Sequence, residues 1–531
     1  MFFDLTDYPY PSRRRVILSR NYAVATSQSL ATLAGIEMFL AGGNAIDAAI
    51  ASAITLTVVE PTANGIGGDA QAIVWDGNKL HGFNGSGKSP ANLPLKAFEG
   101  FAEMPSLGWL CVTVPGAVSL WRTLWEKWGK LPFDRLFAPA IRHASEGFPV
   151  SPVTATAWKT AESVYLPLVS PEYQPFKSVF FPKDRSPYPG EIWGSIDHAR
   201  TLEEIARSGG ESFYTGDLAR KIVDFASFTG GYLSLQDLAN HRTLAVDPIS
   251  TRYRDLEIWE LPPNTQGIAA LLALNILEGF DMARFDRDSP ESFHRQIEAM
   301  KLAFADVYPH VSDPDFMEVG IDRLLDKTYA GKRRESIGDK AIPLAETGLP
   351  RGGTVYLATG DRDLMVSFIQ SNYSGFGSGI LVPETGIALH NRGTGFTLET
   401  GHPNRVAPNK RPFHTIIPAF LRFSDGTIGP MGVMGAPMQP QGHVQMAVNM
   451  ADYLFNPQTA LDAPRWRFLQ GNSVLLERGV APEVVRGLLD RGHNVEIADE
   501  SQFGKGQIIL QRDGILLAAS ESRSDGLALG G

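Results

Sequence analysis

The sequence predicts an α/β protein with a layered core, and three segments carry this prediction. From Ser29 to Leu40, leucine and isoleucine recur at helical spacing before a Gly-Gly pair of the kind that commonly ends a helix. Ala45 to Ile54 is small and apolar on every side, as expected of a helix buried against a sheet. Far downstream, Thr354–Thr359 and Leu364–Ser371 are β-type runs around the turn sequence Gly360–Asp363, which predicts a hairpin.

The rest of the chain divides into a helical middle and a strand-rich end. Residues 118 to 340 are predicted to form mainly helices, and therefore a helical layer or lobe. The clearest of these helices are Val118–Trp128, Ile268–Leu277 and Ser292–Val307. From about residue 339 to Gly353, prolines and glycines predict an exposed loop. Further strands are expected at Ile416–Phe423, Ser473–Leu476 and Gly506–Leu510.

Composition excludes several classes of partner. A formal net charge of -10 with dispersed basic residues would repel nucleic acid and anionic membrane surfaces. Cys111 is the single cysteine, so no intrachain disulfide can form. No apolar run reaches the roughly 20 residues of a membrane span, and the acidic, proline-containing start differs from a signal peptide. We therefore expect a soluble, cytoplasmic protein.

Two glycine motifs match nucleotide-binding patterns but lack the required context. Gly82 to Ser89 fits the phosphate-loop pattern, yet Pro90 and Pro94 would interrupt the helix that must follow it. Gly65 to Ala70 fits the dinucleotide fingerprint, yet Gln71 to Trp75 predicts a strand where that motif needs a helix. The 11 histidines form no metal-ligand motif. We expect neither a metal nor an organic cofactor.

Thr354 has local chemistry that catalysis can use. It opens the predicted hairpin and follows two glycines at the end of the predicted loop. A threonine hydroxyl is a weak nucleophile unless a base lies beside it, and its own α-amine supplies one once the preceding peptide bond is cut. That amine titrates near ~7.7 to 8.0 and accepts a proton near neutral pH. By itself, however, a Gly-Gly-Thr sequence is more often a simple turn.

Motifs spread from residue 22 to about residue 490 resemble those of the γ-glutamyltranspeptidases in order and spacing. One short motif can arise by chance, but so many in order make Thr354 the expected nucleophile. The matching segments are Gly43–Ala49, Val59–Pro61, Asn64–Gly68, Val114–Gly116, Glu298–Asp306, Asp313–Pro314, the Thr354 segment through Gly377, Lys410–Pro412 and Asp462–Arg465.

This resemblance implies a four-layer αββα sandwich of the N-terminal-nucleophile hydrolase type, with an additional mainly helical lobe. It implies a precursor that cuts itself between Gly353 and Thr354. The products would be a large subunit of residues 1–353 and a small subunit of residues 354–531, which stay associated. The resemblance also allows a homodimer of such pairs.

The resemblance also implies a mechanism for amide cleavage. Thr354 would attack the amide carbonyl, and the N–H groups of Gly435 and Ala436 would hold the oxyanion. Ser371, or Asn372 beside it, would form a hydrogen bond with the nucleophile. The acyl group would then pass to water or to an amine or peptide acceptor.

The chain departs from the family where a γ-glutamyl group is expected to bind. The family holds the α-carboxylate with an arginine where this chain has Ser86, and its ammonium-binding acids are missing from residues 390–396. We hypothesise that Arg392 holds a substrate carboxylate instead, with Lys88 as a lesser candidate; a structural ion pair of Arg392 is the alternative. The expected substrate-binding residues are Ser86, Asn391, Arg392, His414 and Thr415.

The sequence thus predicts a self-processed amide hydrolase or acyltransferase with an acyl-enzyme on Thr354. Its substrate would be a γ-glutamyl, glutathione-like amide or a related acidic amide. One alternative is an amidohydrolase or acylase for non-glutamyl substrates, such as an oxamate-like acid amide or the acyl side chain of a cephalosporin. A second alternative is an unprocessed binding protein that keeps the fold without the chemistry.

Overall fold

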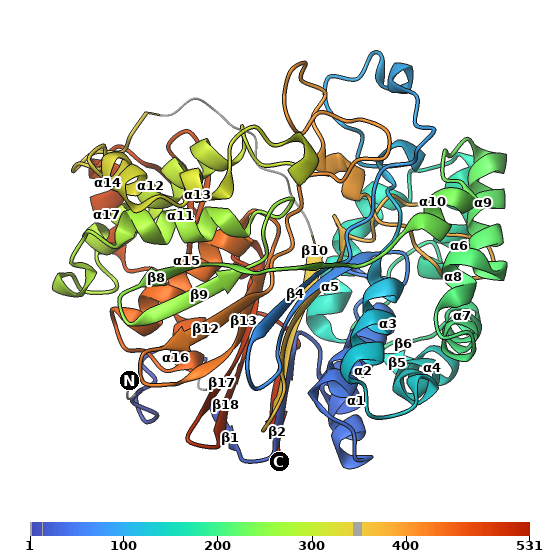
Figure 1. Ribbon diagram of the computed structural model, residues 1–531, viewed down its shortest axis with the longest axis horizontal. Helices are drawn as coiled ribbons and strands as arrows, with labels where there is room; N and C mark the ends of the chain where they lie inside the picture. Colours follow the sequence, from blue (N-terminus) through green and yellow to red (C-terminus); the bar gives the residue numbers. More distant parts are fainter. Residues whose placement is uncertain (1–2, 13, 344–352) are drawn as a thin grey trace.

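Two seven-stranded sheets lie face to face between two layers of helices (Figure 1). The computed structural model describes residues 3–12, 14–343 and 353–531. The first sheet has the strand order β19-β2-β10-β11-β3-β4-β7, and the second has the order β1-β18-β17-β13-β12-β9-β8. The predicted αββα sandwich is confirmed.

The two sheets are built from short strands drawn from the beginning, middle and end of the chain. The first contains β2 (Tyr22–Thr26), β3 (Asp69–Trp75), β4 (Leu80–Asn84), β7 (Leu244–Val246), β10 (Gly353–Asp361), β11 (Met365–Tyr373) and β19 (Leu527–Gly530). The second contains β1 (Ile17–Ser19), β8 (Ile249–Tyr253), β9 (Leu256–Glu260), β12 (Ala419–Phe423), β13 (Ile428–Met434), β17 (Lys505–Arg512) and β18 (Ile515–Ser520). Smaller sheets pair β5 (Phe148–Pro149) with β6 (Ile192–Trp193), and join β14 (Trp466–Gln470), β15 (Ser473–Glu477) and β16 (Asn494–Ala498).

Each sheet has its own helical cover, on opposite sides of the molecule (Figure 1). On the side of the first sheet lie α1 (Ser29–Leu40), α2 (Ala45–Val59), α3 (Ala117–Trp128), α4 (Ala138–Glu146), α5 (Pro152–Tyr165), α6 (Gln174–Phe180), α7 (Ile196–Arg207), α8 (Glu211–Thr215), α9 (Asp217–Thr229) and α10 (Leu235–Asn240). On the side of the second lie α11 (Gly267–Leu277), α12 (Pro290–Val307), α13 (Ile321–Leu324), α14 (Lys327–Arg334), α15 (Met438–Ala451), α16 (Pro457–Asp462) and α17 (Pro482–Asp490).

The helical middle of the chain is divided between these two covers. Its first half, α3 to α10, lies on the side of the first sheet, whereas its second half, α11 to α14, lies on the side of the second. The sequence analysis missed β7, β8 and β9, which lie between these halves. These strands have only three to five residues, too few for a clear period-2 signal.

The buried helix and the β10–β11 hairpin agree with the predictions. Every residue of α2 is buried, and Asn44 caps it through a reciprocal pair of hydrogen bonds with Asp47. Strands β10 and β11 form the predicted antiparallel hairpin at the middle of the first sheet. Between the sheets lie mainly small and branched side chains, such as Ala25, Ala358 and Ile416.

Two further predictions concern loops. Strand β4 leads into residues 85–90, which form no helix, so the phosphate-loop pattern does not have phosphate-loop geometry. The predicted exposed loop before Gly353 falls largely on residues 344–352, outside the described residues. Within the described ranges, no helix combines the length and the apolar character needed to cross a bilayer.

Candidate active site

Thr354 lies buried near the start of β10, at an irregular point in the sheet. Its side chain is 1% exposed, and its hydroxyl donates a hydrogen bond to the Ser371 Oγ at 3.1 Å. Gly353 pairs with Tyr373 and Val355 pairs with Gln370, so β11 bulges by one residue here, and Ser371 and Asn372 together lie opposite Thr354. A bulge redirects side chains out of the regular alternation, and here it brings the two hydroxyls together.

The Ser371 hydroxyl links the nucleophile to the bond that self-cleavage would break. It accepts hydrogen bonds from the Thr354 hydroxyl and from the Tyr373 N–H, the latter at 2.7 Å. It donates its own proton to the carbonyl oxygen of Gly353 at 2.8 Å. A proton leaving Thr354 can therefore pass to Ser371 as the Ser371 proton passes to the Gly353 oxygen, which neutralises the negative charge that develops there.

Gly435 and Ala436 form a strained turn between β13 and α15. Both have positive φ, 132° at Gly435 and 54° at Ala436, and the second value is uncommon for a residue with a side chain. Gln266 holds the turn by donating to the Ala436 carbonyl at 2.8 Å. No described residue accepts a hydrogen bond from the N–H of either residue. Two unpaired N–H groups suit the predicted oxyanion-binding role.

One cavity connects Gly353 with this turn. It has a volume of about 430 Å³, and Gly353, Met434 and Gly435 are among the residues that line it. A wider hollow of about 830 Å³ adjoins Tyr373. Its aromatic lining consists of Phe101, Tyr308, Tyr373, Phe396 and Phe413.

Three of the predicted substrate-binding residues belong to a buried cluster around Asp69, the first residue of β3. The Arg392 guanidinium lies 3.0 and 3.2 Å from the two Asp69 carboxylate oxygens and donates to the Thr415 hydroxyl. His414 Nε2 lies 2.6 Å from Asp69, and His390 Nδ1 lies 3.6 Å away. Arg392 is thus held in an ion pair, the structural alternative that the sequence left open.

The Asp69 cluster is charged despite its burial. Burial acts to raise the pKa of Asp69, but the charge of Arg392, with His414 and His390, holds that pKa well below its ordinary range. Burial, reinforced by Arg392, lowers the pKa of His414 to about 4 although Asp69 opposes this. The cluster therefore pairs an ionised Asp69 with Arg392 and a neutral His414 near neutral pH.

The remaining predicted residues are also held within the protein. Ser86 is fully buried and donates to the Asn84 side chain at 2.7 Å. Asn391 accepts from the Ser374 N–H and donates to the Ser106 carbonyl. These contacts support the backbone of the site rather than reaching toward Thr354.

Asn372 is directed away from the nucleophile. Its side chain donates to the carbonyl of Phe376 at 3.2 Å, whereas that of Ser371 contacts Thr354. Of these two neighbouring residues, Ser371 is the one whose side chain forms a hydrogen bond with the Thr354 hydroxyl. The structure brings Ser371 to it.

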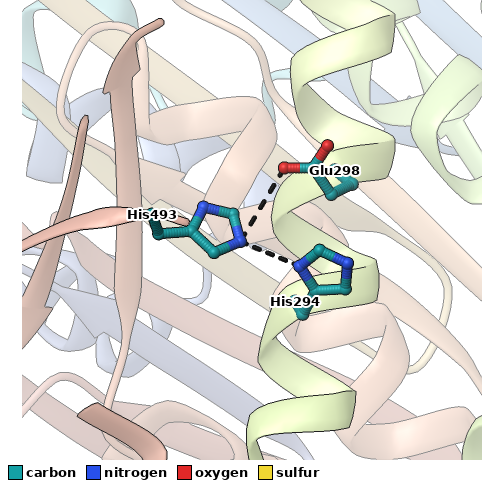
Figure 2. A group of neighbouring side chains, drawn as sticks. All are labelled: His294, Glu298 and His493. Carbon is teal, nitrogen blue, oxygen red and sulfur yellow. Dashed lines mark hydrogen bonds and ion pairs between the residues drawn. The ribbon is translucent and has the colours of Figure 1, made fainter. Parts of the chain in front are cut away.

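A group of possible metal ligands lies elsewhere, on the helical side of the second sheet. Figure 2 shows His493 facing His294 and Glu298 of α12, with its Nε2 2.8 Å from His294 Nδ1 and 3.8 Å from Glu298 Oε1. The Lys301 ammonium donates to the same Glu298 oxygen at 2.9 Å, so a cation would compete with it. His294 also bonds the Gly338 carbonyl, which ties the segment after α14 to α12. The expected absence of a metal stays a prediction.

Replacing Ser371 with alanine is expected to slow self-cleavage by about 10²- to 10³-fold, the usual effect of losing one oxyanion donor. Time-resolved intact mass of freshly synthesised precursor measures this rate. Ser371→Thr keeps the hydroxyl and should cleave within about tenfold of the wild-type rate. Cleavage of the alanine variant at the wild-type rate would contradict the proposed proton path.

Comparison with known proteins agrees with this geometry. Residues 31–531 match the family model described as gamma-glutamyltranspeptidase. The chain belongs to the γ-glutamyltranspeptidase family. The predictions of this family and of an enzyme of the hydrolase or acyltransferase type are confirmed.

Members of the γ-glutamyltranspeptidase family that resemble this chain carry different substrate names. The glutathione hydrolase-like YwrD proenzyme of Bacillus subtilis is 35% identical, over 97% of this chain and 99% of that protein. The oxamate amidohydrolase proenzyme of Klebsiella pneumoniae is 34% identical, over 94% of this chain and 97% of that protein. The crystal structure of cephalosporin acylase from Bacillus halodurans has a TM-score of 0.94 and 49% identity, covering 100% of this chain and 99% of that one. Family membership therefore leaves the substrate open.

The sequence analysis missed three residues of this site: Glu60, Asp69 and Lys505. Asp69 directly follows the family segment Asn64–Gly68, and an acid at the start of a buried strand is a weak signal of a buried ion pair. Glu60 and Lys505 line the Gly353 cavity; Glu60 lies in the family segment Val59–Pro61, whereas no local pattern marks Lys505.

Proposed function

We propose that the protein is a self-processed amide hydrolase whose nucleophile is Thr354. The contact that carries the proposal is the chain of hydrogen bonds from the Thr354 hydroxyl through Ser371 to the Gly353 carbonyl. Attack on that carbonyl would form an ester and release the Thr354 amine, and water would then hydrolyse the ester. The word proenzyme in the names of two relatives supports processing into a large and a small subunit.

After processing, the free amine of Thr354 can act as the base for its own hydroxyl. A substrate amide would be attacked in the same way, with its oxyanion at the N–H groups of Gly435 and Ala436. The resulting acyl-enzyme would react with water or with an amine acceptor. Apart from water or the amine acceptor, this sequence of steps uses only groups of the chain and the substrate.

We propose an acidic acyl group without an α-ammonium as the preferred donor. A γ-glutamyl group needs partners for both an ammonium and a carboxylate. At the positions that the family uses for this purpose, Ser86 and His414 make internal hydrogen bonds, and Arg392 pairs with Asp69. A dicarboxylic acid monoamide has a carboxylate but no ammonium group, so it does not need the missing ammonium partners.

The aromatic hollow beside Tyr373 favours a bulky amine portion over a very small amide. At about 830 Å³ it is far larger than ammonia, the amine released from a primary amide such as oxamate. Its aromatic lining suits a ring system. This observation supports an acylase over an oxamate-type amidohydrolase as the more specific form of the proposal.

The test compares kcat/KM of the self-cleaved protein for glutaryl-p-nitroanilide, γ-glutamyl-p-nitroanilide and oxamate. The two anilides differ only in the α-ammonium, so their ratio isolates its contribution. We expect glutaryl-p-nitroanilide to be preferred by at least about tenfold, since one unmatched charged group costs about 1.5–3 kcal/mol. Preference for the γ-glutamyl anilide would favour a glutathione hydrolase, and preference for oxamate a small-amide hydrolase.

A further inference from the structure

Three cationic side chains line the cavity beside Gly353, and two of them are engaged. Arg523 lies 2.6 Å from Glu477 and 2.7 Å from Glu521. Arg467 donates to the backbone carbonyl and the side chain of Gln502 at 3.0 and 3.1 Å. For the third, Lys505, no described residue forms a hydrogen bond or ion pair with the ammonium. Lys505 is therefore the cation that a ligand in this cavity can engage.

The sheet register places Lys505 next to the expected oxyanion site. Lys505 is the first residue of β17 and pairs with Met434, the last residue of β13. Met434 immediately precedes Gly435, and all three residues line the cavity. An ammonium group and Gly435, one of the two expected oxyanion donors, therefore border the same space as Gly353.

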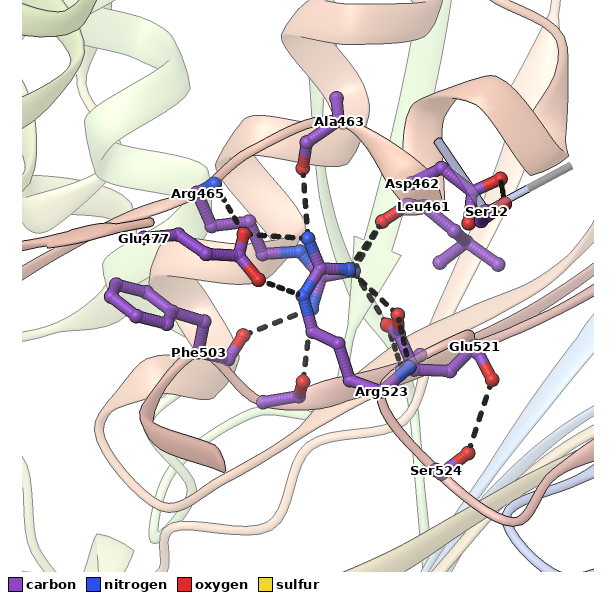
Figure 3. A network of polar contacts seen from close by, with 12 residues as sticks. Ser12, Leu461, Asp462, Ala463, Arg465, Glu477, Phe503, Glu521, Arg523 and Ser524 are labelled. Carbon is purple, nitrogen blue, oxygen red and sulfur yellow. Dashed lines mark hydrogen bonds and ion pairs between the residues drawn. The ribbon is translucent and has the colours of Figure 1, made fainter. Parts of the chain in front are cut away.

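A buried ionic network holds the backbone on both sides of Lys505 (Figure 3). The Arg465 guanidinium donates to the carbonyls of Phe503 and Gly504 at 2.9 and 3.1 Å and pairs with Glu521 at 2.6 Å. Glu521 in turn accepts from the Gly506 N–H at 2.9 Å. With its neighbours fixed, Lys505 needs to order only its side chain on binding a ligand, which reduces the entropic cost.

No described acidic side chain of the cavity pairs directly with Lys505. Glu60 is 4% exposed and accepts from the Ser27 hydroxyl at 2.6 Å. Burial raises the pKa of Glu60, and the positive charge of Lys505 opposes that rise without a direct contact. Asp499 and Glu500 are exposed, and the Asp499 carboxylate accepts the Ser501 N–H.

We propose that Lys505 binds a carboxylate carried by the acyl group of the substrate. In self-cleavage the acyl group is Gly353 itself, so the cavity that Gly353 lines is where a substrate acyl group would lie. Lys505 would then supply the positive charge that the family places at the position of Ser86. The inference rests on the proposed amide hydrolase function and names its specificity residue.

A simpler role for Lys505 is to offset the charge of the buried Glu60. That role predicts a change in stability on removing Lys505 but no change in preference between acidic and neutral acyl groups. The two roles therefore differ in a ratio of rates and not in an absolute rate.

The experiment measures kcat/KM for glutaryl-p-nitroanilide and pentanoyl-p-nitroanilide, which have the same chain length with and without a carboxylate. Lys505→Met is expected to lower the acid-to-neutral ratio by 10- to 100-fold, mainly through KM, in line with the loss of one charge-assisted hydrogen bond. Lys505→Arg should retain most of the ratio because it keeps the charge. Lys79→Met, in the exposed turn after β3, should leave the ratio at its wild-type value.

An unchanged ratio in Lys505→Met overturns the proposal. So does full recovery of the wild-type ratio in Lys505→Met combined with Glu60→Gln, since Lys505 would then act only through Glu60. If a self-cleaved wild-type protein hydrolyses none of the anilides, the proposed function fails separately. Binding of glutarate, measured by calorimetry, then tests Lys505: weaker binding to Lys505→Met supports the inference, and equal binding overturns it.

Discussion

Replacing Thr354 with alanine is expected to leave one uncut chain with no amidase activity, whereas the wild-type protein yields two fragments. The alanine variant lacks the hydroxyl that attacks Gly353, and it also lacks the nucleophile for any substrate. We expect amidase activity to fall by about 10⁴-fold or more, as for other enzymes that lose a covalent nucleophile. Intact mass and N-terminal sequencing measure the cut, and the smaller fragment should begin at Thr354.

Two controls separate loss of the nucleophile from damage to the strand. Thr354→Ser keeps a hydroxyl and should still cut itself. Thr359→Ala removes another buried hydroxyl of β10, one that donates to the Ala45 carbonyl, and should cut at the same bond. An alanine variant at position 354 that still divides between Gly353 and Thr354 would refute the assignment. An uncut wild-type protein would instead favour the non-catalytic binding protein.

Asp69→Asn is expected to lower the free energy of unfolding by about 3–5 kcal/mol, because it leaves the buried Arg392 guanidinium without a counter-charge. Loss of the Asp69 charge should also disturb the active site, since Asp69 pairs with Ser371 across strands β3 and β11. We therefore expect slower self-cleavage together with a lower Tm. Thermal unfolding and intact mass of the same preparation measure both effects.

Asp76→Asn is the matched control at the other end of β3. Asp76 pairs with His81 near the surface, where the two side chains are 24% and 19% exposed, so its loss should cost about 1 kcal/mol or less. Asp69→Leu combined with Arg392→Met removes both charges and should recover part of the stability. If Asp69→Asn unfolds at the wild-type temperature, the Asp69–Arg392 ion pair does not stabilise the protein as its contacts indicate.

Local sequence patterns were sufficient for several parts of the structure. The buried helix α2 and the β10–β11 hairpin each depend on residues close together in the chain, and both agree with prediction. By contrast, β7 to β9 are too short for their period to stand out, and the division of the middle helices between two covers depends on packing that no local pattern records.

The sequence by itself determined the family, the layered fold and Thr354 as the expected nucleophile, because these depend on ordered motifs and local chemistry. Only the tertiary structure decided the partners of that nucleophile. The side-chain contacts at the bulge select Ser371 over Asn372, and a pairing 323 residues apart commits Arg392 to Asp69. The Gly353 cavity likewise joins β10, β13 and β17, which are distant in sequence. These contacts depend on sheet register and burial, and local sequence patterns do not specify either.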